Sequence, residues 1–115
     1  MPEIDFACQR FPVENIVMCS FGIAETDYKV LIYLFTHENK TINEIAKALG
    51  KERSTIQKSI NKLFERDIIE RRQKNLSEGG YKFTYSAKDK DNVKEKISSV
   101  LDSWVLNVKK EIKNW

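Results

Sequence analysis

The chain has 115 residues, of which 41% are hydrophobic and 32% charged, with 20 Lys and Arg against 17 Asp and Glu. This length fits one small domain, and the longest apolar run, Val30 to Phe35, is far shorter than the roughly 18 residues that cross a bilayer. One His and two Cys are too few for a disulfide scaffold or a four-ligand zinc site. We therefore expect a cytoplasmic protein with no membrane contact, metal or cofactor.

The net charge of +3 is unevenly distributed along the chain. Residues 1–50 carry 4 basic and 7 acidic side chains, residues 51–82 carry 9 and 5, and residues 83–115 carry 7 and 5. The middle third is therefore the basic one, at +4. An asymmetry of this kind suggests that one surface meets an anionic partner, of which nucleic acid is the commonest.

The first part of the chain contains an arm and two predicted helices. Residues 1–11 show no clear periodicity, and we expect an extended or loosely packed arm. Pro12 suits the first position of a short helix, which Gly22 ends. The dense apolar pattern from Glu25 to Thr36 then predicts a second helix that is largely buried.

A third predicted helix has a strong start signal. Thr41 and Glu44 have the S/T-x-x-E spacing of a capping box, which predicts a helix from about Asn43 to Leu49. Gly50 supplies the left-handed residue that ends this helix and permits a sharp turn. The chain resumes as a fourth helix, over about residues 53–66, only two or three positions later.

The fourth predicted helix has two different faces. At about 100° per residue, one face carries the apolar side chains Ile56, Ile60, Leu63 and Phe64. The opposite face carries Ser54, Lys58, Asn61 and Glu65, with Gln57 and Lys62 at its flanks.

The pattern after Asp67 predicts a two-stranded hairpin. A first run ends near Leu76, and aromatic and polar residues alternate from Tyr81 to Tyr85. Gly79 and Gly80 between the runs provide the positive φ angles that a tight turn requires. We expect the aromatic side chains of the alternating run to pack on the core.

The last part of the chain predicts one long helix. Residues 88–115 contain neither Gly nor Pro, and apolar residues recur at steps near 3.5, as in a helix of roughly 25 residues. Its apolar stripe is longer than is needed to cover a small domain, which favours a homodimer over packing back on the same core. The predicted dimer interface consists of Val100, Leu101, Trp104, Val108, Ile112 and Trp115.

A capped helix, a glycine turn and a second helix with one apolar face form a helix-turn-helix, and an attached hairpin makes the winged variant. The predicted fold class is therefore mainly α with a small β-hairpin wing. The arm and short helix occupy residues 1–20, the winged helix-turn-helix residues 21–87, and the long C-terminal dimerisation helix residues 88–115.

The polar side chains of the winged motif are candidates for contacts with double-stranded DNA. Bases are read through hydrogen bonds at their edges and phosphates need cations, so the second helix must present long polar side chains to the major groove. On this helix the candidates are Arg53, Ser54, Thr55, Gln57, Lys58, Asn61 and Lys62. On the wing, over residues 71–82, the candidates for the flanking backbone or minor groove are Arg71, Arg72, Lys74 and Lys82.

Other classes of function are less well supported. The chain has no phosphate loop, nucleophile elbow or dinucleotide fingerprint, so we do not expect an enzyme, and no small-molecule ligand is indicated. Two alternatives stay open. One is a winged-helix module for protein interactions in a transcription or replication assembly. The other is a thiol-based, redox-responsive regulator that uses Cys8 and Cys19.

The stretch from Phe21 to Ala87, including TINEIAKALGKERSTIQKSINKLFERDIIERR and GGYKFTY, resembles archaeal TrmB-type and related MarR-like winged-helix transcriptional regulators. The ending LDSWVLNVKKEIKNW is similar to that of small single-domain archaeal members. The resemblance implies a homodimeric DNA-binding regulator, with Arg53 to Asn61 in the recognition helix. We expect such a cytoplasmic regulator to be nucleoid-associated. Ala24 stands where many relatives have a Thr or Ser helix cap. The sugar-binding domain of full-length TrmB regulators has no counterpart in the match, so sugar sensing is not carried over.

Overall fold

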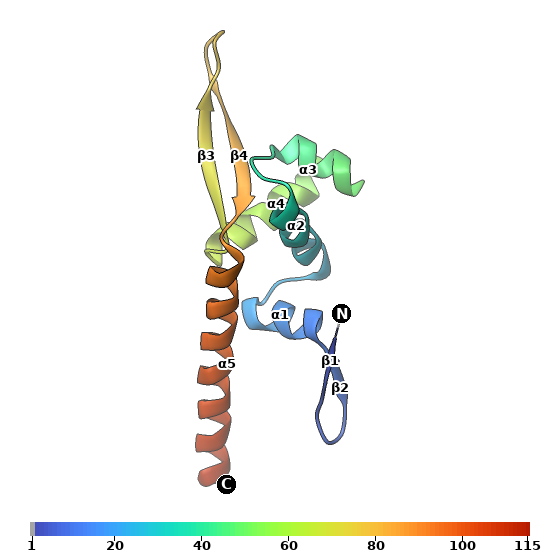
Figure 1. Cartoon of the computed structure of the whole chain (residues 1–115), viewed down its shortest axis with the longest axis vertical. Helices are drawn as coiled ribbons and strands as arrows, with labels where there is room; N and C mark the ends of the chain where they lie inside the picture. The colour runs from blue at the N-terminus through green and yellow to red at the C-terminus, as the bar shows by residue number, and fades with distance from the viewer. Residues whose placement is uncertain (1) are drawn as a thin grey trace. The chain divides into compact units, whose positions relative to one another are not determined.

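The computed structural model describes residues 2–115, and these residues form five helices and two antiparallel two-stranded sheets (Figure 1). The chain separates into two compact units. One unit is residues 23–90, and the other combines the N-terminal residues up to Gly22 with residues 91–115. Each unit is described by itself.

The unit of residues 23–90 contains three helices and a hairpin that extends away from them (Figure 1). Each helix begins and ends within one residue of the span predicted from the sequence. The elements are α2 (Glu25–Thr36), α3 (Ile42–Leu49), α4 (Arg53–Glu65), β3 (Ile69–Asn75) and β4 (Tyr81–Ala87).

The core of this unit lies where α4 packs against α2 and α3. The apolar side chains of α4, Ile56, Ile60 and Leu63, are at most 1% exposed. Burying a side chain of this size stabilises the fold by about 1.5–3 kcal/mol. Phe64 was expected on the same buried face, but it is 47% exposed. At 100° per residue, Phe64 lies at the edge of the apolar face, whereas the buried Leu63 beside it lies near the centre.

The capping box at the start of α3 is confirmed. The Thr41 hydroxyl accepts a hydrogen bond from the Glu44 backbone N–H at 3.2 Å, and the Glu44 carboxylate accepts one from the Thr41 N–H at 3.0 Å. That backbone hydrogen bond holds the pKa of Glu44 below its usual value, with a further contribution from the positive charges of Lys40 and Lys82. Gly50 ends the helix in the left-handed conformation, with φ of 64°, as predicted.

The base of the hairpin is fastened to the segment between α2 and α3. Lys40 and Tyr85 exchange two backbone hydrogen bonds of 3.0 and 2.8 Å. The Asn39 backbone N–H donates to the Ser86 hydroxyl at 2.8 Å. The expectation that the wing aromatics pack on the core holds for Tyr85, which is buried, and is wrong for Tyr81, which is 57% exposed. Only the base of the hairpin therefore reaches the core.

The outer end of the hairpin is a glycine turn, as predicted. Gly79 and Gly80 have φ angles of 94° and 80°, which side chains with a Cβ rarely adopt. The backbone N–H of Leu76 donates to the carbonyl of Gly80 at 3.0 Å and closes the loop between the two strands.

The other unit contains a short hairpin where an extended or loosely packed arm was expected. β1 (Glu3–Asp5) pairs with β2 (Arg10–Pro12), and α1 (Val13–Phe21) follows directly. Pro12 is therefore the last residue of the strand, and it immediately precedes the helix instead of being its first residue. Strands of three residues are too short to show a periodic pattern, and the turn between them has no glycine to reveal it.

The long C-terminal helix, α5 (Lys90–Lys113), has 24 residues, in agreement with the predicted length. Every residue from position 98 to the end is exposed. Among residues 2–115, no helix combines the length and apolar character needed to span a membrane.

We expect the substitution Thr41→Ala to lower the free energy of unfolding by about 1 kcal/mol, because the N–H of Glu44 loses its acceptor at the helix start. Thr36→Ala is the matched control, since the Thr36 hydroxyl is exposed and its hydrogen bonds, to the Tyr33 carbonyl and to His37 Nδ1, lie at the end of α2. It should change the stability by less than about 0.5 kcal/mol. Urea unfolding followed by circular dichroism measures both. Equal losses in the two variants would contradict the role given to the cap.

Candidate nucleic-acid interface

The outward face of α4 carries the side chains that the sequence predicts for base contacts. Ser54, Lys58 and Asn61 are exposed, and Gln57 is half-buried at the edge of this face. Residues three or four positions apart on a helix are neighbours on its surface. The four side chains therefore form one continuous polar strip on the face opposite the buried Ile56.

Two of these side chains are already paired. The Gln57 amide nitrogen donates to the Asn61 amide oxygen at 2.9 Å. The pairing leaves the Gln57 oxygen as an acceptor and the Asn61 nitrogen as a donor. An acceptor beside a donor matches the edge that adenine presents in the major groove. The pair restricts both side chains before any ligand binds, which reduces the entropy cost of recognition.

The start of α4 has the features of an anion-binding site only in part. No acidic residue lies in its first turn, where Arg53 is exposed and Thr55 is half-buried. The first backbone N–H groups of a helix and its dipole favour a negative group there. The N-cap residue is Glu52, whose side chain makes no capping hydrogen bond. The negative charge of Glu52 repels an anion at this position. The positive charge of the neighbouring Arg53 is needed to offset that repulsion.

Lys62, another predicted contact, forms an ion pair with a buried carboxylate, although its own side chain is 43% exposed. Its ammonium lies 3.4 Å from Oδ2 of Asp27, whose side chain is only 8% exposed. The same oxygen accepts a hydrogen bond from the Ala24 backbone N–H at 2.9 Å. Asp27 therefore secures the start of α2, where Ala24 offers no capping side chain, and Lys62 neutralises the buried carboxylate. Sequence reasoning missed this pair because its members are far apart in the chain.

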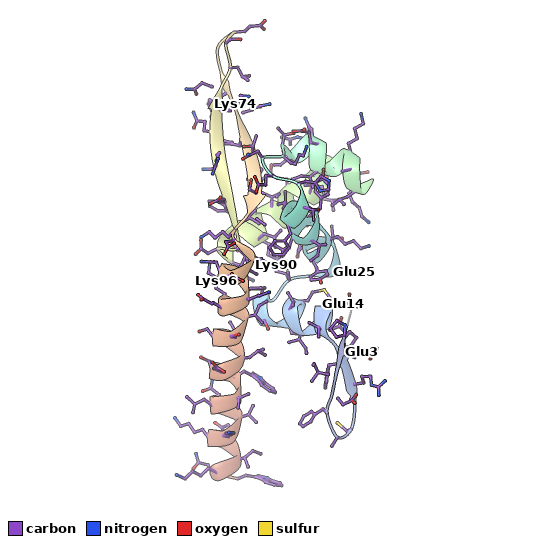
Figure 2. The ribbon with its side chains drawn as sticks, in the orientation of Figure 1. Glu3, Glu14, Glu25, Lys74, Lys90 and Lys96 are labelled. Atoms are coloured by element: carbon purple, nitrogen blue, oxygen red, sulfur yellow. The ribbon has the colours of Figure 1, made fainter. Side chains whose placement is uncertain are left out.

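The strand register divides the predicted wing residues between two faces. Directly opposite residues of an antiparallel pair lie on the same face, and Lys74 is opposite Lys82, with Arg72 opposite Thr84. All three cations are exposed, and Lys74 lies in the outer part of the hairpin (Figure 2). Two like charges in a cross-strand pair repel each other, so an anion such as a phosphate stabilises this face.

Arg71 lies on the other face of the wing, opposite Tyr85. Its guanidinium carbon is 4.2 Å from the ring centre of Phe83 and 5.5 Å from that of Phe64. Tyr81 adds an edge-on contact with Phe83, with ring centres 5.2 Å apart. The structure thus separates Arg71 from the three cations with which the sequence grouped it.

The residues predicted for a dimer interface are exposed in the single chain. Their exposed fractions range from 37% for Leu101 to 99% for Trp115. The sequence reasoning missed Val105, which is 41% exposed and adjacent to the stripe on the helical wheel. Leu106 is 69% exposed on the opposite face of α5.

Two exposed lysines near the helix-turn-helix were also missed. Lys47 lies in the last turn of α3, and Lys51 lies in the turn before α4. The sequence signal for both lysines was their closeness to Gly50. Residues beside the turn of a helix-turn-helix lie near the start of its second helix. They add two positive charges to the region of the interface.

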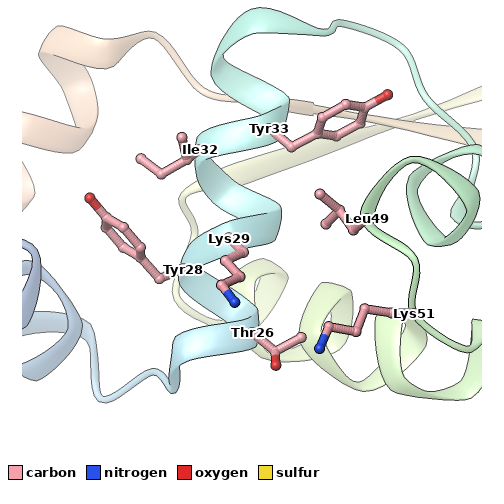
Figure 3. A pocket seen from close by; sticks show the side chains of 7 residues that line it. All are labelled: Thr26, Tyr28, Lys29, Ile32, Tyr33, Leu49 and Lys51. Atoms are coloured by element: carbon pink, nitrogen blue, oxygen red, sulfur yellow. The ribbon is translucent and has the colours of Figure 1, made fainter.

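Two exposed cysteines and one shallow pocket are further features of the structure. Cys8, in the turn between β1 and β2, and Cys19, in α1, are both exposed free thiols. The pocket is an open groove of about 490 Å³ between α2 and the end of α3 (Figure 3). None of the predicted DNA-contacting residues lines it. Its walls are formed by Thr26, Tyr28, Lys29, Ile32, Tyr33, Leu49 and Lys51.

A helix-turn-helix whose second helix is polar outside and apolar inside, followed by a hairpin with one basic face, defines a winged-helix protein. The family model described as "Sugar-specific transcriptional regulator TrmB" matches residues 18–91. The chain belongs to this family of transcriptional regulators.

Relatives and solved structures agree with that assignment. The chain is 33% identical to the uncharacterized protein MJ1082 of Methanocaldococcus jannaschii, over 89% of this chain and 84% of that protein. A possible transcriptional regulator from Methanosarcina mazei Go1 has a similar structure, with a TM-score of 0.90, 31% identity, and coverage of 99% and 97% of the two chains. The S. aureus MepR–DNA complex shares the fold, with a TM-score of 0.57 and 20% identity over 86% and 81% of the chains.

The engagement of Lys62 leads to a stability prediction. We expect Lys62→Met to lower the free energy of unfolding by about 1 kcal/mol or more, because the buried Asp27 carboxylate loses its cation. Lys58→Met, on the exposed face of the same helix, is the control and should change the stability by less than about 0.5 kcal/mol. Chemical denaturation measures both values. Equal stability of the Lys62→Met and unsubstituted proteins would show that the ion pair contributes nothing.

Proposed function

We propose that this chain is a sequence-specific, double-stranded DNA-binding transcriptional regulator that acts as a homodimer. The observation that carries the proposal is the exposed polar strip of α4 formed by Ser54, Gln57, Lys58 and Asn61, directly opposite the helix face that the core buries. A helix fixed in this way can enter the major groove without disturbing the packing beneath it.

Each part of the strip has a chemical role in this proposal. The paired amides of Gln57 and Asn61 present an acceptor and a donor to an adenine edge. Lys58 is exposed between them and donates to a guanine or to a phosphate. Ser54, nearest the start of the helix, donates to a base or to the backbone.

Phosphate contacts flank the base contacts. Arg53 at the start of α4 and the basic wing face of Arg72, Lys74 and Lys82 are all exposed. Contacts of this kind position a protein on the duplex and supply most of its salt-dependent affinity. The charge of +4 on residues 51–82 agrees with this role. The shared fold with MepR, which has been solved with DNA, supports the same mode.

A second copy completes the proposed regulator. One winged helix makes few phosphate contacts, and two copies about one DNA turn apart double them and read a palindrome. The exposed stripe of α5, with Trp104 and Val108 at its middle, offers the apolar surface that a dimer needs. An exposed apolar face of this length is unfavourable in water unless another surface covers it.

The test of base recognition uses the two amides. We expect Gln57→Ala and Asn61→Ala each to reduce the discrimination between the preferred and a substituted site by about 1–3 kcal/mol. Asn92→Ala removes an exposed amide from α5 and should leave the discrimination unchanged. Fluorescence anisotropy with matched duplexes gives the affinities. Unchanged sequence preference in both helix variants would contradict the assignment of α4 as the reading helix.

Salt dependence separates this function from a protein-interaction module. A dimer with about 6–10 phosphate contacts loses roughly a thousandfold or more in affinity between 50 and 200 mM salt. Weak binding that is independent of sequence at low salt would favour the interaction module instead.

The dimer has a separate test. At tens of micromolar, light scattering should give twice the monomer mass for the unsubstituted chain. Combining Trp104→Glu with Val108→Glu should give the monomer mass, because two charges then lie in the middle of the proposed interface. Leu106→Glu, on the opposite face of α5, should remain dimeric. A monomeric unsubstituted chain would refute the dimer, and dissociation caused equally by Leu106→Glu would refute the proposed interface.

A further inference from the structure

The outer part of the wing has little packing to hold it. Every residue from Glu70 to Lys82 is exposed, whereas the base of the hairpin is fixed by the buried Ile68, Ile69 and Tyr85. An isolated two-stranded ribbon is only marginally stable by itself. The cations of the wing lie on this outer part, so their placement depends on whatever stiffens the ribbon.

The contacts of Arg71 provide the connection. The guanidinium lies over Phe83 of β4 and also faces Phe64, which belongs to the last turn of α4. Both distances, 4.2 and 5.5 Å, are within the range of about 6 Å in which a cation is attracted to an aromatic ring. Three side chains from β3, β4 and α4 thus form one stack.

The stack also accounts for the position of two aromatic side chains that lie outside the buried core. Phe64 is exposed at the end of α4, and Phe83 is half-buried on the wing face that carries no free cation. Neither contributes to the buried core. Both rings face the guanidinium of Arg71, and this contact accounts for their position outside the core.

We propose that Arg71 is a positioning residue that couples the direction of the wing to the recognition helix, and that it does not itself bind phosphate. The consequence of this coupling for DNA binding rests on the proposed function. Under that function, the stack fixes how far the cations of Lys74 and Lys82 lie from the base-reading side chains of α4. Arginine is required because its planar guanidinium stacks on aromatic rings, whereas the compact ammonium of lysine does so less well.

The first arm of the test measures the free protein. Hydrogen exchange of the backbone amides in residues 72–83 is followed for the full chain with Arg71→Lys and with Phe83→Leu. Both substitutions should accelerate exchange in this segment by about two- to fivefold, the change expected when one exposed cation–π interaction is removed. Arg72→Lys, on the opposite face, is the matched control and should leave exchange unchanged. Unchanged exchange in both Arg71→Lys and Phe83→Leu overturns the proposal.

The second arm measures binding to a duplex as a function of salt. The slope of log affinity against log salt falls by about 0.9 for each phosphate that the protein no longer neutralises. Arg72→Ala should therefore flatten the slope. Arg71→Ala should reduce affinity with an unchanged slope, and Arg71→Lys should fail to restore the affinity although it restores the charge. A slope flattened by Arg71→Ala as much as by Arg72→Ala overturns the proposal, as does full rescue by lysine.

The two arms separate this inference from the function on which it rests. If the unsubstituted chain binds no duplex, the proposed function fails. The exchange measurement still decides whether Arg71 holds the wing to α4.

Discussion

The structure depends on the burial of one face of α4. Ile56, Ile60 and Leu63 are almost completely removed from water between α2 and α3, and this burial leaves the helix only one rotational setting. The opposite face, with Ser54 and Asn61, must then point outward. The same apolar contacts therefore stabilise the unit of residues 23–90 and orient the polar surface of α4, so no separate scaffold is needed to hold that surface outward.

Local signals made the helices predictable from the sequence. The capping box of Thr41 and the left-handed Gly50 fix the bounds of α3 through interactions within a few residues. The same reasoning could not find the ion pair between Asp27 and Lys62, because it joins residues of different helices. Nor could it separate Arg71 from its basic neighbours, since the strand register that puts it on the other face becomes visible only when both strands are aligned.

Basic residues that look equivalent in the sequence have three different environments. Lys62 neutralises a buried carboxylate, Arg71 is stacked between aromatic rings, and Lys74 is exposed beside another cation. Net charge counts them equally, but the proposed function assigns direct phosphate contact to the third kind. The membership of the TrmB family is consistent with a basic interface, and two copies of the chain would double its positive excess toward DNA.

The central claim is that α4 reads base sequence and that two copies do so together. Selection of bound fragments from random duplex DNA tests it most directly, because the result depends on no assumed operator. The account predicts an enriched motif made of two inverted half-sites whose centres lie about 10–10.5 base pairs apart, which is one turn of the DNA duplex. Bound fragments with no enriched sequence, or with a single half-site only, would contradict it.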